Sequence, residues 1–345
     1  MRFGIIGSGS WAIALAKILT DNNASINWWI RNETVIEHIE NRHHHPHYLS
    51  SVYFDTSQLV LTSNINQVIA ESDCLVMVVP SAYIDTVLEK LPKNIFEGKK
   101  LLSAVKGILP EQNLLLNDYL KDQFRFPLND YFTVMGPCHA EEVSAEKLSY
   151  LTFSGIDETT RDEIASNFST PYLNIIGNKD IYGVQYAAVL KNIYALGAGM
   201  AHGLEYGDNF LSVLISNCAD EMAGFLRKVG ISHIEVGVHE EEDAVSHKRS
   251  SNYAASAYLG DLLVTCYSLF SRNRTFGNMI GKGYSVKVAQ LELNMVAEGY
   301  NASKCIYLIN KKVQASMPLA ETIYKILWEN VKVKEGFKQI ETFLV

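Results

Sequence analysis

Cysteine is scarce in this sequence, and its few copies are far apart. The chain has 345 residues and five cysteines, and no two of them form a C-x-x-C pair. The cysteines are Cys74, Cys138, Cys218, Cys266 and Cys305. This spacing argues against a zinc site and against a disulfide framework. It fits a reducing compartment, so we expect a cytoplasmic protein.

An excess of positive charge and long apolar runs are also missing. The formal net charge is -8, which argues against a nucleic-acid partner. No apolar run reaches the roughly 20 residues that a membrane-spanning helix needs, and no charged leader with a cleavage site opens the chain. The composition, 48% hydrophobic and 20% charged, is that of a globular protein long enough for two domains. We expect no membrane insertion.

Strand-like apolar runs alternate with helical stretches in the first half of the chain. The runs span residues 2–6, 26–31, 74–80, 100–107, 131–137, 148–155 and 172–177. This alternation predicts a parallel sheet with helices on both faces. After about residue 180 the strand-like runs stop and helical patterns follow. The fold class is therefore α/β, with a doubly wound N-terminal domain, residues 1–180, and a mostly helical C-terminal domain, residues 181–345.

A glycine-rich turn follows the first predicted strand. Residues 7–12 read GSGSWA, which fits G-x-G-x-x-A between a strand and a helix. In this pattern Gly7 permits the tight turn, Gly9 lets the backbone approach a pyrophosphate, and Ala12 lets the helix pack closely on the strand. The amides at the start of the helix then face the phosphates. The first domain is therefore predicted to be of Rossmann type and to bind a dinucleotide.

The end of the second predicted strand bears on which dinucleotide is bound. An acidic residue there favours NAD, whereas this chain has Arg31, with Glu33 close by. A guanidinium at this place suits a 2′-phosphate. A solvated surface arginine is the alternative. NADP is slightly favoured, and NAD stays open.

Further candidates lie at carboxyl ends of predicted strands, where open parallel sheets bind ligands. Lys106 is a cation at such an end, and Gly107 opens the backbone beside it. The alternative for Lys106 is a solvated lysine, but the run before it is apolar. Gly136 and Cys138 follow another strand and offer backbone and a small side chain to a substrate.

The predicted helical domain contains a lysine within an apolar helix. Lys191 lies in AVLKNIYALGAGMAHGL, where a lysine must snorkel, form an ion pair or take part in chemistry. Held near a carboxylate, for which Asp261 is the candidate, it can protonate a carbonyl oxygen. The segment 271–273, Ser-Arg-Asn, suits a phosphate, because a guanidinium forks onto phosphate oxygens and its neighbours donate singly. A helix cap with a solvated arginine is the alternative.

Four histidines, His43, His44, His45 and His47, lie close together in the sequence. A metal site is conceivable there. However, no carboxylate or cysteine lies in register, and Pro46 indicates a loop. We expect a polar loop near the cofactor and no metal.

Six of these segments, taken together, resemble those of the bacterial-type NAD(P)-dependent glycerol-3-phosphate dehydrogenases. They are GSGSWA (7–12), VKG (105–107), GPCHAEEV (136–143), LKN (190–192), GDLLVTC (260–266) and SRNRTFG (271–277). VAEGYNA (296–302) resembles a late Val-x-Glu-Gly element of the family. The order is kept, and the match covers nearly the whole chain.

The resemblance implies reversible, NAD(P)H-dependent reduction of glycerone phosphate to sn-glycerol 3-phosphate, which feeds glycerophospholipid synthesis. It implies that Lys191 is the proton donor, with Asp261 and Lys106 as the other catalytic residues. Besides Gly7 and Gly9, the cofactor residues would be Ser10, Trp11, Arg31, Lys106, Ala140, Arg272, Val296 and Glu298. The substrate residues would be Lys106, Gly136, Cys138, Lys191, Asp261, Ser271, Arg272 and Asn273.

The chain departs from the family pattern at several points. Cys138 stands where serine is usual, Gln185 stands where glutamate is expected, and LISNCADEM (214–222) lacks a Thr-Arg-Gly. The stretch 222–260 is longer than usual, and its polar part, residues 239–256, is predicted to be a surface loop or an irregular segment. Two alternatives stay open: a related two-domain reductase of a ketoacid or hydroxyacid, and a non-catalytic NADP(H)-binding protein. We expect a small phosphorylated substrate and, from apolar helix faces, a homodimer.

Overall fold

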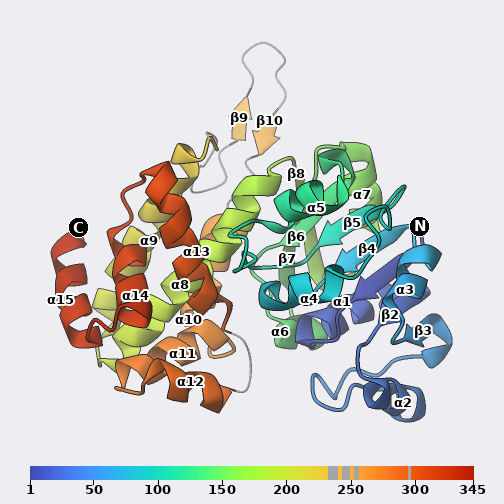
Figure 1. Ribbon diagram of the computed structural model, residues 1–345, viewed down its shortest axis with the longest axis horizontal. Coiled ribbons are helices and arrows are strands. Elements are labelled where there is room, and N and C mark those ends of the chain that lie inside the picture. Colours follow the sequence, from blue (N-terminus) through green and yellow to red (C-terminus); the bar gives the residue numbers. More distant parts are fainter. Residues whose placement is uncertain (232–239, 243–248, 252–255, 294–296) are drawn as a thin grey trace. The chain divides into compact units, whose positions relative to one another are not determined.

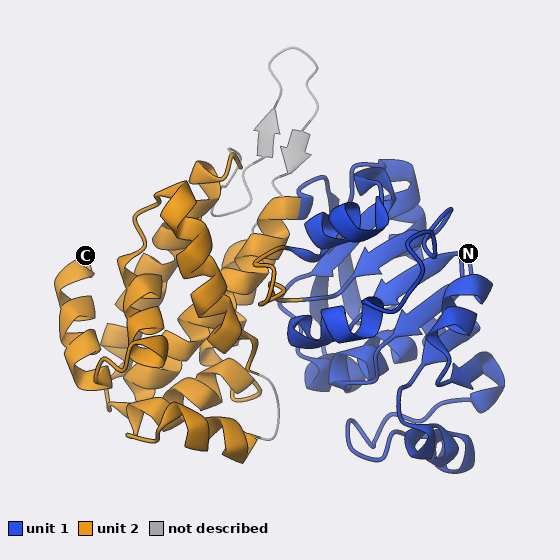
Figure 2. Ribbon diagram, viewed as in Figure 1, with its two compact units in different colours: residues 1–105, 115–181 blue, residues 106–114, 182–345 orange. Residues whose placement is uncertain are grey.

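The computed structural model describes residues 1–231, 240–242, 249–251, 256–293 and 297–345. Its elements are labelled in Figure 1. Two compact units divide the chain: residues 1–105 with 115–181, and residues 106–114 with 182–345 (Figure 2). The first unit is a sheet with helices and the second is mostly helical, which confirms the predicted fold class.

The first unit is built on an eight-stranded sheet. The strands are β1 (Phe3–Ile6), β2 (Ile26–Trp29), β3 (Leu59–Thr62), β4 (Cys74–Met77), β5 (Lys100–Ser103), β6 (Tyr131–Met135), β7 (Ser149–Ser154) and β8 (Leu173–Asn178). They lie in the order β3-β2-β1-β4-β5-β6-β7-β8. Only β6 and β7 pair antiparallel in this sheet, so the prediction of a parallel sheet was wrong for that pair. The strand order reverses at β1 and β4, where a doubly wound fold binds its ligand.

Helices cover both faces of this sheet (Figure 1). They are α1 (Ser10–Asp21), α2 (Glu33–Arg42), α3 (Ile65–Glu71), α4 (Ile84–Leu88), α5 (Leu116–Phe124), α6 (Ala140–Ser144) and α7 (Glu158–Ser166). A row of fully buried register partners, Trp28, Ile5, Val76, Leu102 and Phe132, crosses five strands on the face that α1 and α7 cover. Burial on both faces explains why these strands are continuous apolar runs in the sequence.

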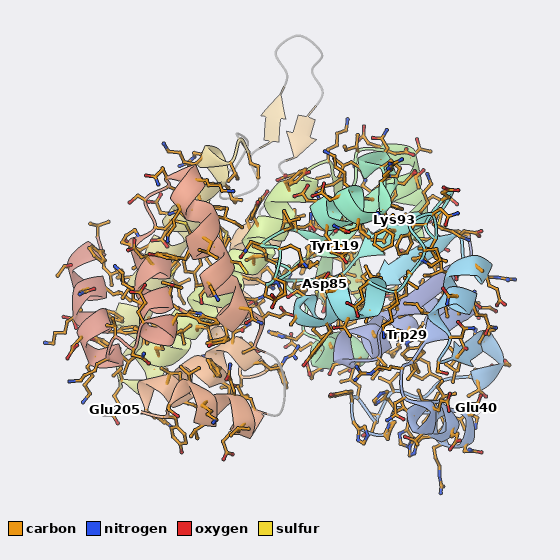
Figure 3. The ribbon with its side chains drawn as sticks, viewed as in Figure 1. Trp29, Glu40, Asp85, Lys93, Tyr119 and Glu205 are labelled. Carbon is orange, nitrogen blue, oxygen red and sulfur yellow. The ribbon has the colours of Figure 1, made fainter. Side chains whose placement is uncertain are left out.

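On the other face, α4 and α5 are joined by polar side chains. Tyr119 of α5 bonds to Asp85 of α4, and both are labelled in Figure 3. Burial raises the pKa of the Tyr119 phenol, and the hydrogen bond to Asp85 raises it further. The phenol therefore stays protonated and acts as a donor.

The second unit is formed by eight α-helices in the part of the chain that the structure describes. They are α8 (Ile181–Gly203), α9 (Asp208–Lys228), α10 (Asp261–Tyr267), α11 (Arg272–Gly281), α12 (Val286–Leu293), α13 (Glu298–Val313), α14 (Pro318–Trp328) and α15 (Val333–Phe343). Every residue of α8 from 187 to 201 is buried, as expected for a helix that is apolar on all sides. None of the helices so described has the length and apolar character needed to cross a bilayer.

Glycines let α8 and α11 touch at their backbones. Gly199 and Gly203 of α8 face α11, and Gly277 and Gly281 of α11 face α8. A methyl group at any of the four would lie 2.0 to 2.4 Å from a carbonyl oxygen of the other helix. Because real carbon atoms do not approach oxygen so closely, only glycine permits this crossing. The contact fixes the start of α11 relative to Lys191 of α8.

Part of the polar segment 239–256 is not a loop. Two short strands, β9 (Glu240–Glu242) and β10 (Arg249–Ser251), pair antiparallel there, so the loop prediction was wrong for these residues. Most of the remaining segment lies outside the described residues. A pairing of three residues rests on backbone hydrogen bonds, which leave no alternating pattern in the sequence.

Candidate active site

The glycine turn combines one glycine required by the fold with one that the fold leaves free. Gly7 has a φ of +131°, and a Cβ there would lie 2.9 Å from the carbonyl oxygen of Val78. Gly9 is the N-cap residue of α1, and no described atom lies within 4 Å of the place where its Cβ would be. Packing therefore explains Gly7, whereas the open space at Gly9 fits the approach of a ligand phosphate.

The backbone around this turn presents amides to that space. Trp28 donates a hydrogen bond of 2.7 Å from Nε1 to the carbonyl oxygen of Gly7, which fixes the turn against β2. Ser10 is the first residue of α1, and the amides at the start of a helix have no acceptor within the helix. Gly9 has no side chain that could cap them. An anion beside the turn would gain these amides and the helix dipole, so the residues present fit a dinucleotide pyrophosphate.

Arg31 is exposed beyond the end of β2. Its neighbour Asn32 caps α2 by accepting a hydrogen bond of 3.0 Å from the amide of Thr34. Glu33, which made the sequence ambiguous here, accepts a hydrogen bond of 2.9 Å from the hydroxyl of Ser63. The carboxylate is thus held toward the loop after β3, while the guanidinium is accessible to solvent.

The segment after β6 forms a second tight turn. Gly136 has a φ of +133°, and a Cβ there would lie 2.5 Å from the carbonyl oxygen of Tyr150. Cys138 is buried and donates from Sγ to the carbonyl oxygen of Gly136 over 3.2 Å. Ala140 is the first residue of α6. The fold therefore requires glycine at 136 even without a ligand, and the roles predicted for these three residues in binding stay predictions.

In the helical unit, the two charged residues predicted to pair do so. Lys191 Nζ forms an ion pair with Asp261 Oδ1, and the two residues are only 4% and 1% exposed. Asp261 Oδ2 is also buried, and no described residue donates a hydrogen bond to it. A buried ion pair is costly unless its remaining polar atoms find partners, and this one leaves a carboxylate oxygen open. The pair therefore suits a place where a polar ligand atom binds.

The local backbone explains the position of Asp261. A π-helix spans residues 256–260, and Asp261 follows as the first residue of α10. π-helical turns are rare in proteins, and those that occur often lie at functional sites. Thr265 donates from its hydroxyl to the carbonyl oxygen of Asp261 over 2.6 Å, which braces the first turn of α10.

Two asparagines connect four segments of this unit. Asn192 donates to the carbonyl oxygen of Lys106, Asn273 donates to Asn192 Oδ1, and Gly299 donates its backbone amide to Asn273 Oδ1. Each of these hydrogen bonds is 2.9 Å long. They bring together Lys106, the residue after Lys191, the start of α11 and the residue after Glu298. Since the side-chain oxygen of Asn273 is taken, a phosphate would meet its backbone amide or its remaining side-chain hydrogen.

Ser271 and Arg272 begin α11 in different environments. Ser271 is buried and caps the helix by accepting a hydrogen bond of 3.2 Å from the amide of Arg274. Its hydroxyl proton can still be donated. Arg272 is exposed at the first helical position. The helix-cap alternative thus holds for Ser271, and the predicted phosphate contacts of both residues stay predictions. Val296 lies outside the described residues.

The histidine-rich segment has a structural role at one residue. His45 is buried, and its Nδ1 accepts backbone hydrogen bonds from His47 and Tyr48 over 3.1 and 3.2 Å. Burial lowers the pKa of His45 to about 4, with smaller contributions from the neighbouring histidines. Within the described ranges, no three His, Cys, Asp or Glu side chains converge on a point where a metal ion would sit.

The chain departs from the family pattern in α8, at Gln185, and in α9, in the segment 214–222. Gln185 is buried in α8. Asn217, in the segment that lacks Thr-Arg-Gly, donates to the carbonyl oxygen of Val345 over 3.1 Å. It also accepts a hydrogen bond of 3.4 Å from the backbone amide of Val345. Asn217 is therefore bonded to the last residue, Val345.

Sequence reasoning missed Glu221, a buried acid of α9. Its carboxylate accepts hydrogen bonds from the amides of Leu319 (2.7 Å) and Ala320 (2.9 Å) and from the hydroxyl of Tyr194 (3.1 Å). Burial raises the pKa of Glu221 to about 7, although these donors lower it. Glu221 thus caps α14 from another helix and connects it to α8, one turn beyond Lys191. The sequence gives no signal for it, because an acidic residue in an amphipathic helix is ordinarily expected on the face exposed to solvent.

The chain is similar to known proteins over nearly its whole length. The family model described as NAD-dependent glycerol-3-phosphate dehydrogenase N-terminus matches residues 2–160, and the model described as its C-terminus matches residues 180–338. Glycerol-3-phosphate dehydrogenase (NAD(P)+) of Agathobacter rectalis is 31% identical, over 98% of this chain and 95% of that protein. The Bacillus subtilis protein of the same name is 30% identical, over 97% and 92%. The fold matches the crystal structure of glycerol-3-phosphate dehydrogenase from Coxiella burnetii, with a TM-score of 0.84, 22% identity and 98% of both chains covered.

Proposed function

We propose a site and a mechanism from the premise that this chain belongs to the NAD-dependent glycerol-3-phosphate dehydrogenase family. It is an oxidoreductase that reduces glycerone phosphate to sn-glycerol 3-phosphate with NADH or NADPH. The reaction is reversible. A ketoacid reductase and a non-catalytic binding protein are not favoured, because the family matches extend over both halves of the chain.

The observation that carries the mechanism is the buried pair of Lys191 and Asp261 with one open carboxylate oxygen. Asp261 keeps the Lys191 ammonium charged and oriented. Lys191 donates a proton from Nζ to the carbonyl oxygen of the substrate, which becomes the hydroxyl of the product. When bound, the nicotinamide would supply the hydride for the carbonyl carbon. Lys191 is left as a neutral amine that regains its proton from solvent, and in the oxidation direction the neutral amine is the base.

Lys106 is proposed to add positive charge where the alkoxide develops. Asn192 holds the backbone of Lys106 over 2.9 Å, so the segment that carries this lysine is tied to the helix that carries Lys191. Asn192 is therefore a positioning residue. This connection supports a shared role for the two lysines.

The substrate phosphate is proposed to bind at the start of α11. Arg272 supplies an exposed guanidinium there, and Ser271 and Asn273 supply single donors. Gly136 and Cys138 are proposed to contact the rest of the substrate. The thiol of Cys138 is a weaker hydrogen-bonding group than the usual serine hydroxyl, so backbone carries more of that contact.

The dinucleotide is proposed to bind with its pyrophosphate at Gly7, Gly9 and the first amides of α1. Arg31 is proposed to meet the 2′-phosphate of NADP, which makes NADP slightly preferred over NAD. The further cofactor contacts proposed are Ser10, Trp11, Lys106, Ala140, Arg272, Val296 and Glu298.

We further propose a cytoplasmic homodimer that supplies sn-glycerol 3-phosphate for glycerophospholipid synthesis. All five cysteines are buried and none of them is in a disulfide, which suits a reducing compartment. Leu263, Tyr267, Leu269 and Phe270 are apolar and exposed on the helical unit, which supports association. The functional domains are proposed as residues 1–180 and 181–345. Residues 106–114 lie within the first range in the sequence but belong to the second compact unit.

A hydride-transfer assay tests the proposed function. NADPH and NADH oxidation with glycerone phosphate is followed by absorbance for the natural chain, Lys191→Met, Asp261→Asn and, as a control, the exposed Lys338→Met. We expect turnover in the natural chain and the control. In Lys191→Met we expect a loss of about 10²–10⁴-fold, the usual contribution of a general acid. Turnover of Lys191→Met equal to that of the control would refute the role of Lys191.

A further inference from the structure

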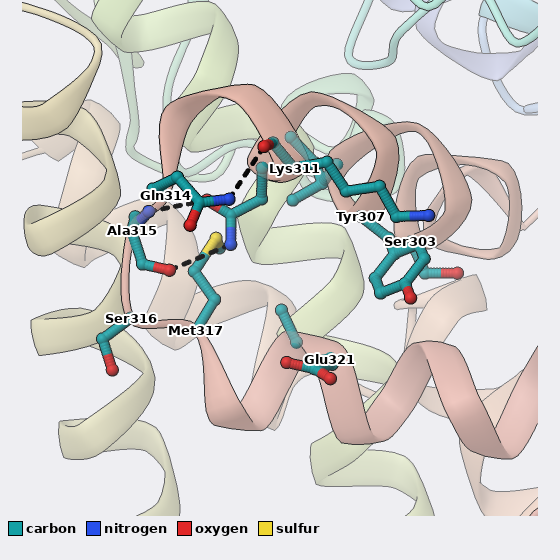
Figure 4. A pocket seen from close by; sticks show the side chains of 11 residues that line it. Ser303, Tyr307, Lys311, Gln314, Ala315, Ser316, Met317 and Glu321 are labelled. Atoms are coloured by element: carbon teal, nitrogen blue, oxygen red, sulfur yellow. Dashed lines mark hydrogen bonds between the residues drawn. The ribbon is translucent and has the colours of Figure 1, made fainter.

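The helical unit contains a cavity that the mechanism does not use. It has a volume of about 400 Å³ and lies between α13 and α14 (Figure 4). Its walls come from residues 303–321, which include none of the proposed catalytic or binding residues. Small-molecule sites have volumes of roughly 300–1,000 Å³. The cavity is therefore large enough for a ligand but not for a folded partner.

The cavity has one cationic side chain that is not neutralised. Lys311 Nζ lies 4.7 Å from the ring centroid of Tyr307, and in the described ranges no carboxylate pairs with it. The acid on the opposite wall, Glu321, is bound to Lys325 over 2.7 Å. Because that acid has its own partner, the field inside the cavity is set by Lys311 and favours an anion.

The rest of the lining is partly apolar. The side chains of Ile306, Met317 and Ala320 are buried and line the cavity. The ring of Tyr307 stacks on Tyr324, with ring centroids 3.9 Å apart and planes inclined by 9°. An anion with a short apolar chain would contact these side chains, whereas a bare inorganic ion would not.

We infer that the cavity between α13 and α14 is a second small-molecule site, which binds an organic anion with a short apolar segment. The charged group lies at Lys311 and the apolar segment lies against Ile306, Met317 and Ala320. Carboxylates and phosphate monoesters share this chemistry. The inference does not depend on the proposed reaction, because none of these residues takes part in it.

Hydrogen bonds connect one residue of the cavity wall to α8, the helix that carries Lys191. Ala320 lines the cavity, and its amide donates to Glu221. Glu221 in turn accepts a hydrogen bond from Tyr194 of α8. A ligand against Ala320 therefore acts on the start of α14, on Glu221 and through Tyr194 on α8. We expect occupancy of the site to change turnover.

Binding is measured on the full chain by NMR of ¹³C-methyl methionine. The chain has 8 methionines, and the Met317 resonance is assigned with Met317→Leu. The probes are hexanoate, hexyl phosphate, inorganic phosphate and, as the neutral arm, 1-hexanol. We expect saturable shifts of Met317 with hexanoate, hexyl phosphate or both, and at least about tenfold weaker binding of 1-hexanol and inorganic phosphate, the change that 1.4 kcal/mol gives.

A matched pair of variants isolates the charge. Lys311→Gln is expected to weaken the binding of hexanoate by about tenfold, whereas Lys312→Gln, at the next and also exposed lysine, leaves it unchanged. Equal affinities in the two variants, or no saturable shift of Met317 with either organic anion, would overturn the site. These outcomes are read without the enzymatic reaction, so a failure of the proposed function would not mimic them.

The coupling to α8 is measured as kcat at saturating glycerone phosphate. Saturating substrate removes any competition by hexanoate at the active site. With hexanoate at about its Kd for the natural chain, we expect kcat to change by at least about twofold in the natural chain and in Lys312→Gln, and to change much less in Lys311→Gln, whose site is then mostly empty. A constant kcat in all three proteins would overturn the coupling while leaving the binding result as it stands.

Discussion

At the residue scale, the charge of Arg31 separates the two nicotinamide cofactors. Arg31→Gln removes an exposed guanidinium beyond β2 while Glu33 keeps its bond to Ser63. A charge-assisted hydrogen bond contributes about 1.5–3 kcal/mol, so the ratio of kcat/KM for NADPH to that for NADH is expected to fall by about tenfold or more. Steady-state kinetics with both cofactors measures this. Arg42→Gln, at another exposed arginine, is the control, and an equal ratio in the two variants would contradict the role of Arg31.

Glu221 predicts a pH dependence of stability. Burial raises its pKa from 4.5 to about 7. The folded state thus holds this proton at pH values where the unfolded state has lost it, so the contribution of Glu221 to the free energy of unfolding rises as the pH falls from about 7 to 4.5. The whole change is about 3 kcal/mol, since one pKa unit corresponds to about 1.4 kcal/mol.

Urea denaturation at about pH 5 and about pH 8 tests this on the natural chain and on Glu221→Gln, which has no titrating group at the site. The natural chain is expected to gain stability relative to the variant at the lower pH. Glu335→Gln, at an exposed acid of α15, controls for a general effect of charge. A difference between the natural chain and Glu221→Gln that stays constant with pH would refute the buried carboxylate as the cause.

At the scale of elements, the crossing of α8 and α11 predicts opposite effects for two glycine substitutions. In Gly277→Ala the new methyl would lie 2.0 Å from the carbonyl oxygen of Leu196, so the helices must separate. We expect a loss of about 1–3 kcal/mol, the usual cost of overpacking. In Gly224→Ala of α9 no described atom lies within 4 Å of the methyl. There we expect a gain of up to about 1 kcal/mol from helix propensity.

Thermal unfolding followed by circular dichroism measures both variants. Gly277→Ala is also expected to lose turnover, because α11 carries the start of the proposed phosphate site. If both substitutions shifted the melting temperature in the same direction, the close crossing would not be what requires Gly277.

The strands of the sheet differ in how well the sequence predicts them. The strands buried on both faces were predicted, because burial produces continuous apolar runs. β3 was missed, since its residues are half-buried or exposed at the sheet edge. The antiparallel direction of β7 was missed as well, because direction depends on the path of the connecting segment and not on the residues of the strand.

At the scale of the whole molecule, the parts of the candidate site that were predictable are those with local patterns. The glycine turn has fixed spacing between a strand and a helix, and Lys191 is a charge within an apolar helix. Its pairing with Asp261 was inferred from chemistry, since no spacing connects residues 70 positions apart. The asparagine contacts of Lys106 and the capping of α14 by Glu221 were not predictable, because side-chain bonds between distant segments leave no pattern in any one of them.

The two units also separate the proposed binding of the dinucleotide from the proposed proton transfer, which gives a last prediction. The glycine turn belongs to the first unit, and the pair of Lys191 and Asp261 belongs to the second. Gly9 and Gly207 are both N-cap residues, with φ, ψ of -80°, 179° and -77°, 176°. Apart from chain neighbours, no described atom lies within 4 Å of a Cβ at either place, and both residues have the extended backbone that valine favours. They are a matched pair that differs in the proposed ligand.

Calorimetric titration with NADPH measures dinucleotide binding separately from proton transfer by Lys191. Gly9→Val is expected to bind NADPH at least about tenfold more weakly, because its side chain takes the space proposed for the pyrophosphate. Gly207→Val is expected to bind like the natural chain, and Lys191→Met is expected to bind NADPH yet lose turnover. If Gly9→Val and Gly207→Val bound NADPH equally well, the phosphates would not lie on the turn, and its open space would need another explanation. If Lys191→Met lost NADPH binding together with turnover, the two functions would not be separable, and the loss of activity could not be assigned to proton transfer.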